Sequence, residues 1–200
     1  MNDTKEHILT TSLNLFLQKS FKEVTMKEIE QKTGLSKGAF YHYFSSKEQV
    51  FEEVIAHFYE DIMITDYSKY PQDSLYAFYT ESVKGKREKM NSAKIVLANG
   101  ENRFTANHYF LLFDAMRMLP NFNKLCMKQQ KDDLEAWAKV VHTAKASGEI
   151  VSVLTSEEIA KLFVYSGKGI GINYIMADNI EKSRKVIKEL WDSLYTSLKK

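Results

Sequence analysis

The sequence predicts an all-helical protein with a small N-terminal three-helix head and a larger helical body. Apolar residues recur at intervals of three and four along most of the chain, and no segment shows the strict alternation of a half-buried strand. Four segments, beginning at Asp3, Thr25, Ser45 and Thr155, carry a glutamate three residues later, which is the pattern of a capping box. Periodicity, start signals and stop signals together predict nine or ten helices.

The first three predicted helices are short and cover residues 3–19, 25–33 and 36–43. Gly34 can adopt the positive φ that ends the second helix, and the hydroxyl of Ser36 can cap the third. Two short helices joined by a three- or four-residue turn that contains glycine form a helix-turn-helix. The head is therefore predicted to contain this motif.

The remaining predicted helices are longer, and prolines, glycines and capping residues set their ends. They cover residues 46–69, 72–89, 92–103, 105–119, 121–147, 155–177 and 180–198. No repeat or low-complexity linker interrupts the chain, so the helix that starts at Ser46 is expected to run from the head into the body. We expect residues 1–47 to form the head and residues 48–200 the body.

Composition excludes a disordered, collagen-like or low-complexity chain. Of the 200 residues, 44% are hydrophobic and 27% are charged, which suits an ordinary hydrophobic core. The single cysteine, Cys126, cannot form an intramolecular disulfide, and this favours a reducing cytoplasm. The sequence shows no signal peptide and no run of the roughly 18 apolar residues that a transmembrane helix needs. We therefore expect a cytoplasmic protein with no membrane partner.

Charge is polarised only in the head. The formal net charge of the chain is +2, but residues 1–47 hold seven lysines against five acidic residues, and residues 31–47 hold no acid. If Phe40 and Tyr43 face the core of the head, helical spacing turns their neighbours outward. The predicted DNA-contacting residues are Thr25, Ser36, Lys37, Gly38, Ala39, Tyr41, His42 and Lys47.

These residue types suit contact with a duplex. Small side chains at Gly38 and Ala39 let the backbone enter the major groove, and Lys37 can reach a guanine edge or a phosphate. Hydroxyl and imidazole groups can donate to phosphates, while Lys47 would add a flanking positive charge. The alternative is a plain helical hairpin with a solvated lysine face, which spacing alone does not exclude.

The run from Val24 to Glu48 resembles the DNA-binding signature of the TetR family of bacterial transcriptional regulators. The pattern is Gly-x-Ser-x-Gly-x-x-Tyr-x-x-Phe-x-x-Lys, starting at Gly34, and the resemblance covers about the first 50 residues. The chain departs from the family at Glu30, where a small residue is usual. The resemblance implies a DNA-binding regulator rather than an enzyme, acting as a repressor that a small molecule releases from a palindromic operator.

The resemblance also implies a homodimer in which the helices near 121–147 and 155–177 of each subunit form a four-helix interface. Helical spacing and small residues suit such a face, although the same residues could pack within the subunit. The candidates for the interface are Ile159, Phe163, Gly167, Ile170, Gly171 and Tyr174.

A small-molecule effector, mostly apolar or aromatic, is expected to bind in the body. Its candidate contacts are aromatic and apolar residues of the middle helices, whose spacing is also that of an ordinary core. They are Phe58, Ile62, Tyr109, Phe113, Met116 and Trp137.

Two other functions remain open. A helical nucleotide-binding enzyme could use the glycines of 167–171, but no strand precedes them and no Gly-Lys-Ser/Thr ending is present. A helical interaction protein without DNA affinity is the other. The five histidines are scattered without metal-ligand spacing, and Cys126 has no histidine nearby. We expect no catalytic residue, metal ion or cofactor.

Overall fold

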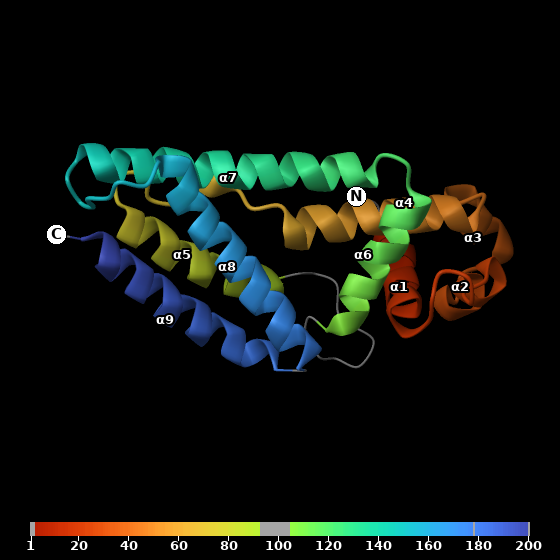
Figure 1. Cartoon of the computed structure of the whole chain (residues 1–200). Coiled ribbons are helices and arrows are strands. Elements are labelled where there is room, and N and C mark those ends of the chain that lie inside the picture. The colour runs from red at the N-terminus through yellow and green to blue at the C-terminus, as the bar shows by residue number, and fades with distance from the viewer. Residues whose placement is uncertain (1–2, 93–104, 178, 200) are drawn as a thin grey trace. The chain divides into compact units, whose positions relative to one another are not determined.

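The computed structural model describes residues 3–92, 105–177 and 179–199 (Figure 1). In these ranges the regular structure is entirely helical, with nine α-helices and no strand, which confirms the predicted fold class. The chain divides into two compact units. Unit 1 contains residues 1–64 and 92–123, and unit 2 contains residues 65–91 and 124–200.

Unit 1 holds the three short N-terminal helices and two that pack with them. They are α1 (Asp3–Gln18), α2 (Met26–Thr33), α3 (Lys37–Tyr43), α4 (Lys47–Phe58) and α6 (Ala106–Met118). Contacts join α1 to α2, α4 and α6, and join α4 to α6. The bounds of the first three helices agree with the predicted ones to within one residue, because capping residues and Gly34 set them locally.

The core of unit 1 comes from one face of each helix. Apolar residues spaced by three and four along α1 and α4 are buried, as the predicted helical periodicity requires. The buried side chains of these two helices include Leu9, Leu13, Phe16, Leu17, Val50, Phe51, Val54, Ile55 and Phe58.

The prediction of one helix over residues 46–69 is wrong. The α-helix α4 ends at Phe58, and one π-helical turn, η1 (Tyr59–Met63), follows with a hydrogen bond from Ile64 N to Tyr59 O. Ile64 is extended, and a short 3₁₀ turn, η2 (Tyr67–Lys69), begins after Asp66. The carboxylate of Asp66 accepts from Ser68 N at 3.2 Å, so this local turn competes with continued helix.

The capping box predicted at Ser45 and Glu48 is not formed, and Ser46, one residue further along the chain, caps α4 instead. The hydroxyl of Ser46 accepts from Gln49 N at 3.1 Å, and Ser45 N donates to Gln49 Oε1 at 3.0 Å. Glutamine can reach back to the backbone as glutamate does, and this allows the shift. The box at Thr155 and Glu158 is confirmed.

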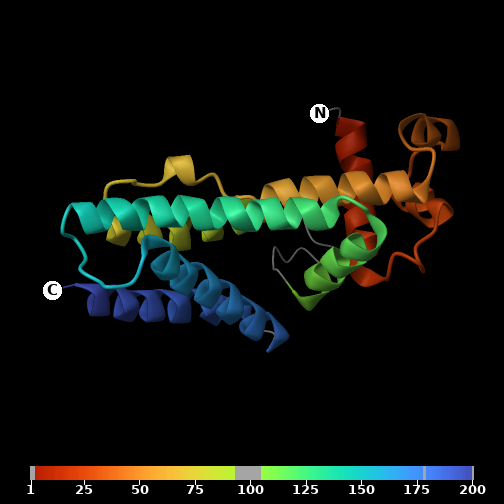
Figure 2. The same cartoon turned by 45° about the horizontal axis from the view of Figure 1, so that its top comes forward.

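Unit 2 is built from longer helices, namely α5 (Leu75–Ser92), α8 (Ser156–Met176), α9 (Ile180–Leu198) and all but the first two residues of α7 (Phe122–Ala146). The helices α8 and α9 run side by side in both views (Figures 1 and 2). The helix predicted over 92–103 falls almost wholly outside the described residues.

Aromatic rings fill the core of unit 2. Trp137 is almost completely buried, and its ring lies 5.0 Å from that of Phe78, 5.3 Å from that of Phe163 and 5.0 Å from that of Trp191, between centroids. Tyr79 and Tyr195 extend the cluster. Offset and edge-to-face contacts of this kind stabilise a core beyond the apolar area that they bury.

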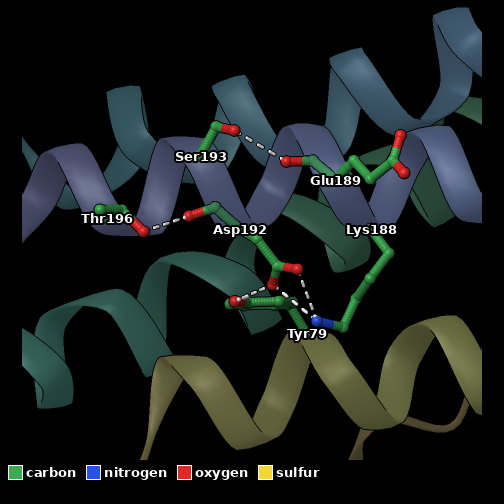
Figure 3. Close-up of polar contacts among 6 residues, drawn as sticks. All are labelled: Tyr79, Lys188, Glu189, Asp192, Ser193 and Thr196. Atoms are coloured by element: carbon green, nitrogen blue, oxygen red, sulfur yellow. Dashed lines mark hydrogen bonds and ion pairs between the residues drawn. The ribbon is translucent and has the colours of Figure 1, made fainter.

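Polar contacts close the edge of this core between α5 and α9 (Figure 3). The hydroxyl of Tyr79 donates to Asp192 Oδ1 at 2.7 Å, and Lys188 Nζ donates to the same carboxylate. Burial and the hydrogen bond to Asp192 raise the pKa of Tyr79 above its usual value. The phenol therefore stays protonated as a donor.

The carboxylate of Glu149, in the turn after α7, caps the N-terminus of α5. It accepts from Leu75 N and Tyr76 N, each at 3.0 Å, and from the hydroxyl of Tyr195. Although burial opposes the shift, these backbone donors hold the pKa of Glu149 below its usual value.

Among the described residues, no helix has the length and apolar content needed to cross a bilayer.

Candidate nucleic-acid interface

The structure confirms a helix-turn-helix in unit 1. The hydroxyl of Thr25 accepts from Glu28 N at 3.2 Å and caps the start of α2. Gly34 ends α2 with a φ of 68°, in the left-handed region that glycine enters without strain. The hydroxyl of Ser36 then accepts from Ala39 N at 3.3 Å and starts α3.

One large ring fixes the orientation of α3. Phe40 is fully buried, as is Ile29 of the preceding helix, and Phe44 follows α3 into the same core. Tyr43 is half-buried rather than fully inside, with its ring 5.3 Å from that of His42. The face of α3 opposite Phe40 is left to solvent.

The exposed residues of α3 are the five predicted for it: Lys37, Gly38, Ala39, Tyr41 and His42. A Cβ placed on Gly38 would meet no atom within 4 Å, so the surface there is open to a second molecule. The ammonium of Lys37 lies 5.9 Å from the centre of the Tyr41 ring. That these side chains contact DNA stays a prediction.

Lys47 is placed differently from the other candidates. It is half-buried, and its Nζ donates to two backbone carbonyls, those of Phe21 at 2.8 Å and Val24 at 2.7 Å. The ammonium also lies 4.2 Å from the centre of the Phe21 ring. Its predicted role as a flanking charge therefore competes with a role inside the head.

The sequence analysis did not select Lys27, which is exposed in the first turn of α2, two residues after the cap at Thr25. Its cationic side chain adds to the positive character of the same end of the helix. The neighbouring Lys19 is paired with Glu28, with 2.6 Å between Nζ and Oε1. The position of Lys27, two residues after the predicted cap at Thr25, is the sequence signal that could have marked it as a candidate for DNA contact.

The residues predicted to contact an effector do not share one environment. Phe58 and Trp137 are buried, in unit 1 and unit 2 respectively, and Tyr109 is half-buried. Phe113 is 54% exposed and Met116 is 38% exposed, so neither is buried in a core, and their contact with an effector stays a prediction. Their part of α6 turns other residues, such as Leu112 and Ala115, to the core. The side chain of Ile62 lies outside the described residues.

His108 is a buried imidazole at the start of α6. Its Nδ1 accepts from Thr105 N at 3.0 Å, and its ring lies 5.6 Å from that of Phe58, between centroids. Burial lowers the pKa of His108 to about 4, against the opposing effect of the backbone hydrogen bond. The sequence analysis missed this capping role, although the three-residue spacing from Thr105 could have indicated it.

The first half of the predicted dimer face of α8 is turned toward the chain's own core. Ile159 and Phe163 are fully buried, and a Cβ on Gly167 would lie 2.7 Å from Cζ2 of Trp191. Ile170, Gly171 and Tyr174, listed with them in the prediction, are half-buried. The close approach of α9 explains why position 167 needs glycine.

The opposite side of α8 carries a second apolar row. Its members, spaced by three or four residues, are Leu162, Tyr165, Gly169, Ile172 and Met176. Met176 is 78% exposed, and a Cβ on Gly169 would meet no atom within 4 Å. A row with this spacing is typical of a seam between helices.

The glycines of 167–171 lie within the continuous helix α8, where they form no phosphate-binding loop. Among the described residues, no group of three or more His, Cys, Asp or Glu side chains is arranged to hold a metal ion. The geometry therefore gives no support to the nucleotide-binding alternative.

Comparison with known proteins points to the helix-turn-helix segment of the chain. The family model for bacterial regulatory proteins of the tetR family matches residues 8–54. The chain is 52% identical over 48 residues to the uncharacterized HTH-type transcriptional regulator YerO of Bacillus subtilis (strain 168), a match that covers 24% of this chain and 17% of that protein. The family model thus matches the N-terminal quarter of the chain.

Two further comparisons extend beyond the helix-turn-helix. The biofilm operon icaADBC HTH-type negative transcriptional regulator IcaR of Staphylococcus aureus (strain Newman) is 23% identical over 141 residues, which cover 66% of this chain and 76% of that protein. The crystal structure of a putative transcriptional regulator of the TetR/AcrR family shares the fold, with a TM-score of 0.62 at 18% identity over 97% of this chain and 100% of that one.

Proposed function

Because the chain belongs to the TetR family of DNA-binding bacterial transcriptional regulators, which are not enzymes, we propose that it is a repressor that a small molecule releases from a palindromic operator. The observation that carries this proposal is the capped helix-turn-helix with five exposed small, cationic or hydrogen-bonding residues on α3. The description of IcaR as a negative regulator supports the sign of regulation. A protein that regulates transcription would act in the cytoplasm.

We propose that α3 enters the major groove. Gly38 and Ala39 would let the backbone approach the bases, with the methyl of Ala39 available to a thymine methyl. Lys37 would reach a guanine edge or a phosphate, and Tyr41 and His42 would donate to phosphates. Ser36 would start the helix, because its hydroxyl oxygen accepts from Ala39 N, and its O–H would still be able to donate to a phosphate.

The start of α2 would hold the phosphate backbone beside this groove. Thr25 lies at a helix N-terminus, where free amides and the macrodipole favour an anion. The exposed ammonium of Lys27, within the same turn, would strengthen that contact. Contacts of this kind fix the position of the protein on DNA, whereas α3 would read the sequence.

We propose a homodimer whose interface uses the outer apolar row of α8. The buried side chains Ile159 and Phe163 are not available to a partner, so the interface moves to the row that contains Leu162, Ile172 and Met176. Large exposed apolar side chains in one row mark a protein interface more often than solvated surface. Two α8 helices packed along their rows would cover them.

Residues 1–47 would then serve as the DNA-binding head and residues 48–200 as the body that binds the effector and the partner subunit. The effector would be mostly apolar or aromatic, in keeping with the dense ring cluster of unit 2. For the effector to release the protein from DNA, the protein must bind it more tightly in one arrangement of the two heads than in the other.

Selection of duplexes from a random pool tests the proposal. A dimer with two such heads is expected to recover an inverted repeat with half-sites about 10 bp apart, or somewhat more. Recovery of a single asymmetric half-site would contradict the dimer. Failure to bind any duplex at low salt would favour an interaction protein without DNA affinity.

A further inference from the structure

Lys47, the first residue of α4, is held inside the head by contacts that none of the lysines described over residues 3–43 makes. Its Nζ donates to Phe21 O at 2.8 Å and to Val24 O at 2.7 Å, and it lies above the face of the Phe21 ring. Hydrogen bonds to a charged group are shorter and stronger than neutral ones. Most of the donor capacity of this ammonium is therefore used within the protein.

The stability of α4 does not explain these contacts. Lys47 is the first residue of α4, where the macrodipole disfavours a cation. The helix is already capped by Ser46, and Gln49 closes the reciprocal contact with Ser45. The ammonium of Lys47 thus acts on the segment that it contacts, rather than on its own helix.

That segment leads directly into the helix-turn-helix. Residues 21–23 form a turn in which Glu23 N donates to Ser20 O at 3.0 Å and Ser20 N donates to Glu23 Oε2 at 2.9 Å. Val24 is fully buried, and the next residue, Thr25, caps α2. The hydrogen bond from Lys47 Nζ to the Val24 carbonyl therefore ties the start of α2 to the start of α4.

Phe21 joins the same contact to α1. Its ring lies 5.9 Å from that of Phe16 on α1 and 4.8 Å from that of Phe51 on α4, between centroids. Lys47 covers another part of the ring, so the side chain is almost fully buried. One turn of backbone is thus held by α1 and α4 together.

We propose that Lys47 is a positioning residue that ties the turn between α1 and α2 to α4 and so sets the angle at which the helix-turn-helix meets DNA, without itself contacting the duplex. The proposal rests on the DNA-binding function. One part of its test also uses the proposed homodimer.

The experiment compares three variants of the full chain. Lys47→Met keeps an unbranched stem on the Phe21 ring but removes the ammonium. Lys37→Met removes an exposed charge from α3, and Ile29→Val weakens the buried core of α2 without touching the contact of Lys47. Binding to a mixed-sequence duplex and to the selected operator is measured across a range of salt concentrations. Operators with one base pair added or removed between the half-sites are measured in parallel.

The slope of log affinity against log salt separates a phosphate contact from a positioning role. Lys37→Met is expected to flatten the slope by about 0.9 for each phosphate contact that is lost. Lys47→Met is expected to weaken operator binding roughly 10-fold or more, as loss of charged hydrogen bonds would, while leaving the slope unchanged. A slope that falls with Lys47→Met as it does with Lys37→Met would overturn the proposal.

Operator spacing separates positioning from general destabilisation. With the head less firmly oriented, Lys47→Met is expected to reduce the penalty for altered spacing by about threefold or more relative to the unmodified protein. Ile29→Val should weaken all operators alike and keep that penalty. Retention of the full penalty by Lys47→Met would show a merely structural role and would also overturn the proposal.

A second variant covers the case in which Lys47→Met does not fold. Phe21→Leu removes the ring beneath the ammonium without changing the charge, and its position is too buried to contact DNA. It is expected to reduce the spacing penalty at an unchanged salt slope, and an unchanged penalty would count against the proposal. If the unmodified protein shows no spacing penalty, the homodimer fails, and the salt slopes of the Lys47 and Lys37 variants still decide the role of Lys47.

Discussion

The helices α3 and α8 use their surfaces in different ways. In unit 1, α3 buries Phe40 and turns small and polar residues to solvent. In unit 2, α8 buries Ile159 and Phe163 on one side and exposes Leu162 and Ile172 on the other. A helix with one apolar face can bury that face against its own chain. A helix with two apolar faces buries one in this way and leaves the other for contact with a second molecule. This difference is the reason that we propose polar recognition by α3 and apolar association by α8.

The inner face of α8 should give the largest effect. Phe163→Ala is expected to lower the free energy of unfolding by about 3–5 kcal/mol, because it leaves a cavity beside Trp137 and Trp191. Urea denaturation measures this loss. Lys161→Ala, two residues earlier and exposed, is the control and should change stability by less than about 0.5 kcal/mol. Similar losses in both variants would show that the inner face is not distinct.

Acid should distinguish the two units. His108 in unit 1 has a pKa of about 4, whereas an unfolded histidine titrates near 6.5. Between these values the unfolded chain binds the extra proton, so stability should fall by about 3 kcal/mol as the pH drops through this window. Denaturation at several pH values measures the loss, and His108→Gln should remove it.

The carboxylate of Glu149 in unit 2 provides the control for this prediction. Because its pKa is depressed in the folded protein, its contribution is present above the unfolded value and is lost as the pH falls from that value through the lower, folded one. Glu149→Gln should therefore leave the pH dependence between about 5 and 6.5 intact. A flat profile in the unmodified protein across that window would contradict the role given to His108.

The outer face of α8 should control assembly rather than folding. Ile172→Asp is expected to weaken the dimer by about 100-fold or more, since a carboxylate would be buried against an apolar partner surface. Sedimentation over a range of protein concentrations measures this change. The adjacent exposed variant Asn173→Asp carries the same charge and should leave assembly much less affected. An intact Ile172→Asp dimer would move the interface off this row.

The exposed face of α3 should give the smallest effect on affinity but a change in specificity. Ala39→Val is expected to alter the preferred base at one position of each half-site, worth about 1–3 kcal/mol, with little change in stability. Duplex selection with the variant reads out the new preference. Gln31→Ala, exposed on α2, is the control and should keep the original site. An unchanged site with Ala39→Val would mean that α3 does not read bases through this residue.

Much of the local structure could be predicted because its causes are local. The bounds of α2 and α3 follow from Thr25, Gly34 and Ser36, which act within one turn of the helix ends. The continuation of α4 to residue 69 could not be judged in this way. Its end at Phe58 depends on competition between helix and the turn at Asp66, which apolar spacing does not report.

The candidate sites divide along the same line. Spacing oriented α3 correctly because Phe40 is its one fully buried residue and its other positions are small or polar. The same reasoning could not choose between the faces of α8, where apolar residues follow both sides and spacing has no preferred direction, and it selected Ile159 and Phe163, which the chain's own core covers. Apolar spacing likewise gave no sign that Phe113 and Met116 are exposed, because α6 is also apolar on its exposed side.

The sequence by itself determined the all-helical class, the helix-turn-helix and the outward face of α3, since caps, turns and a single apolar face depend on residues a few positions apart. The tertiary structure decided which face of α8 is covered, and it decided the environments of His108 and Lys47. Lys47 is held by Phe21, a residue 26 positions earlier in the chain. Contacts between residues so distant in sequence form only when helices pack, and local patterns carry no record of them.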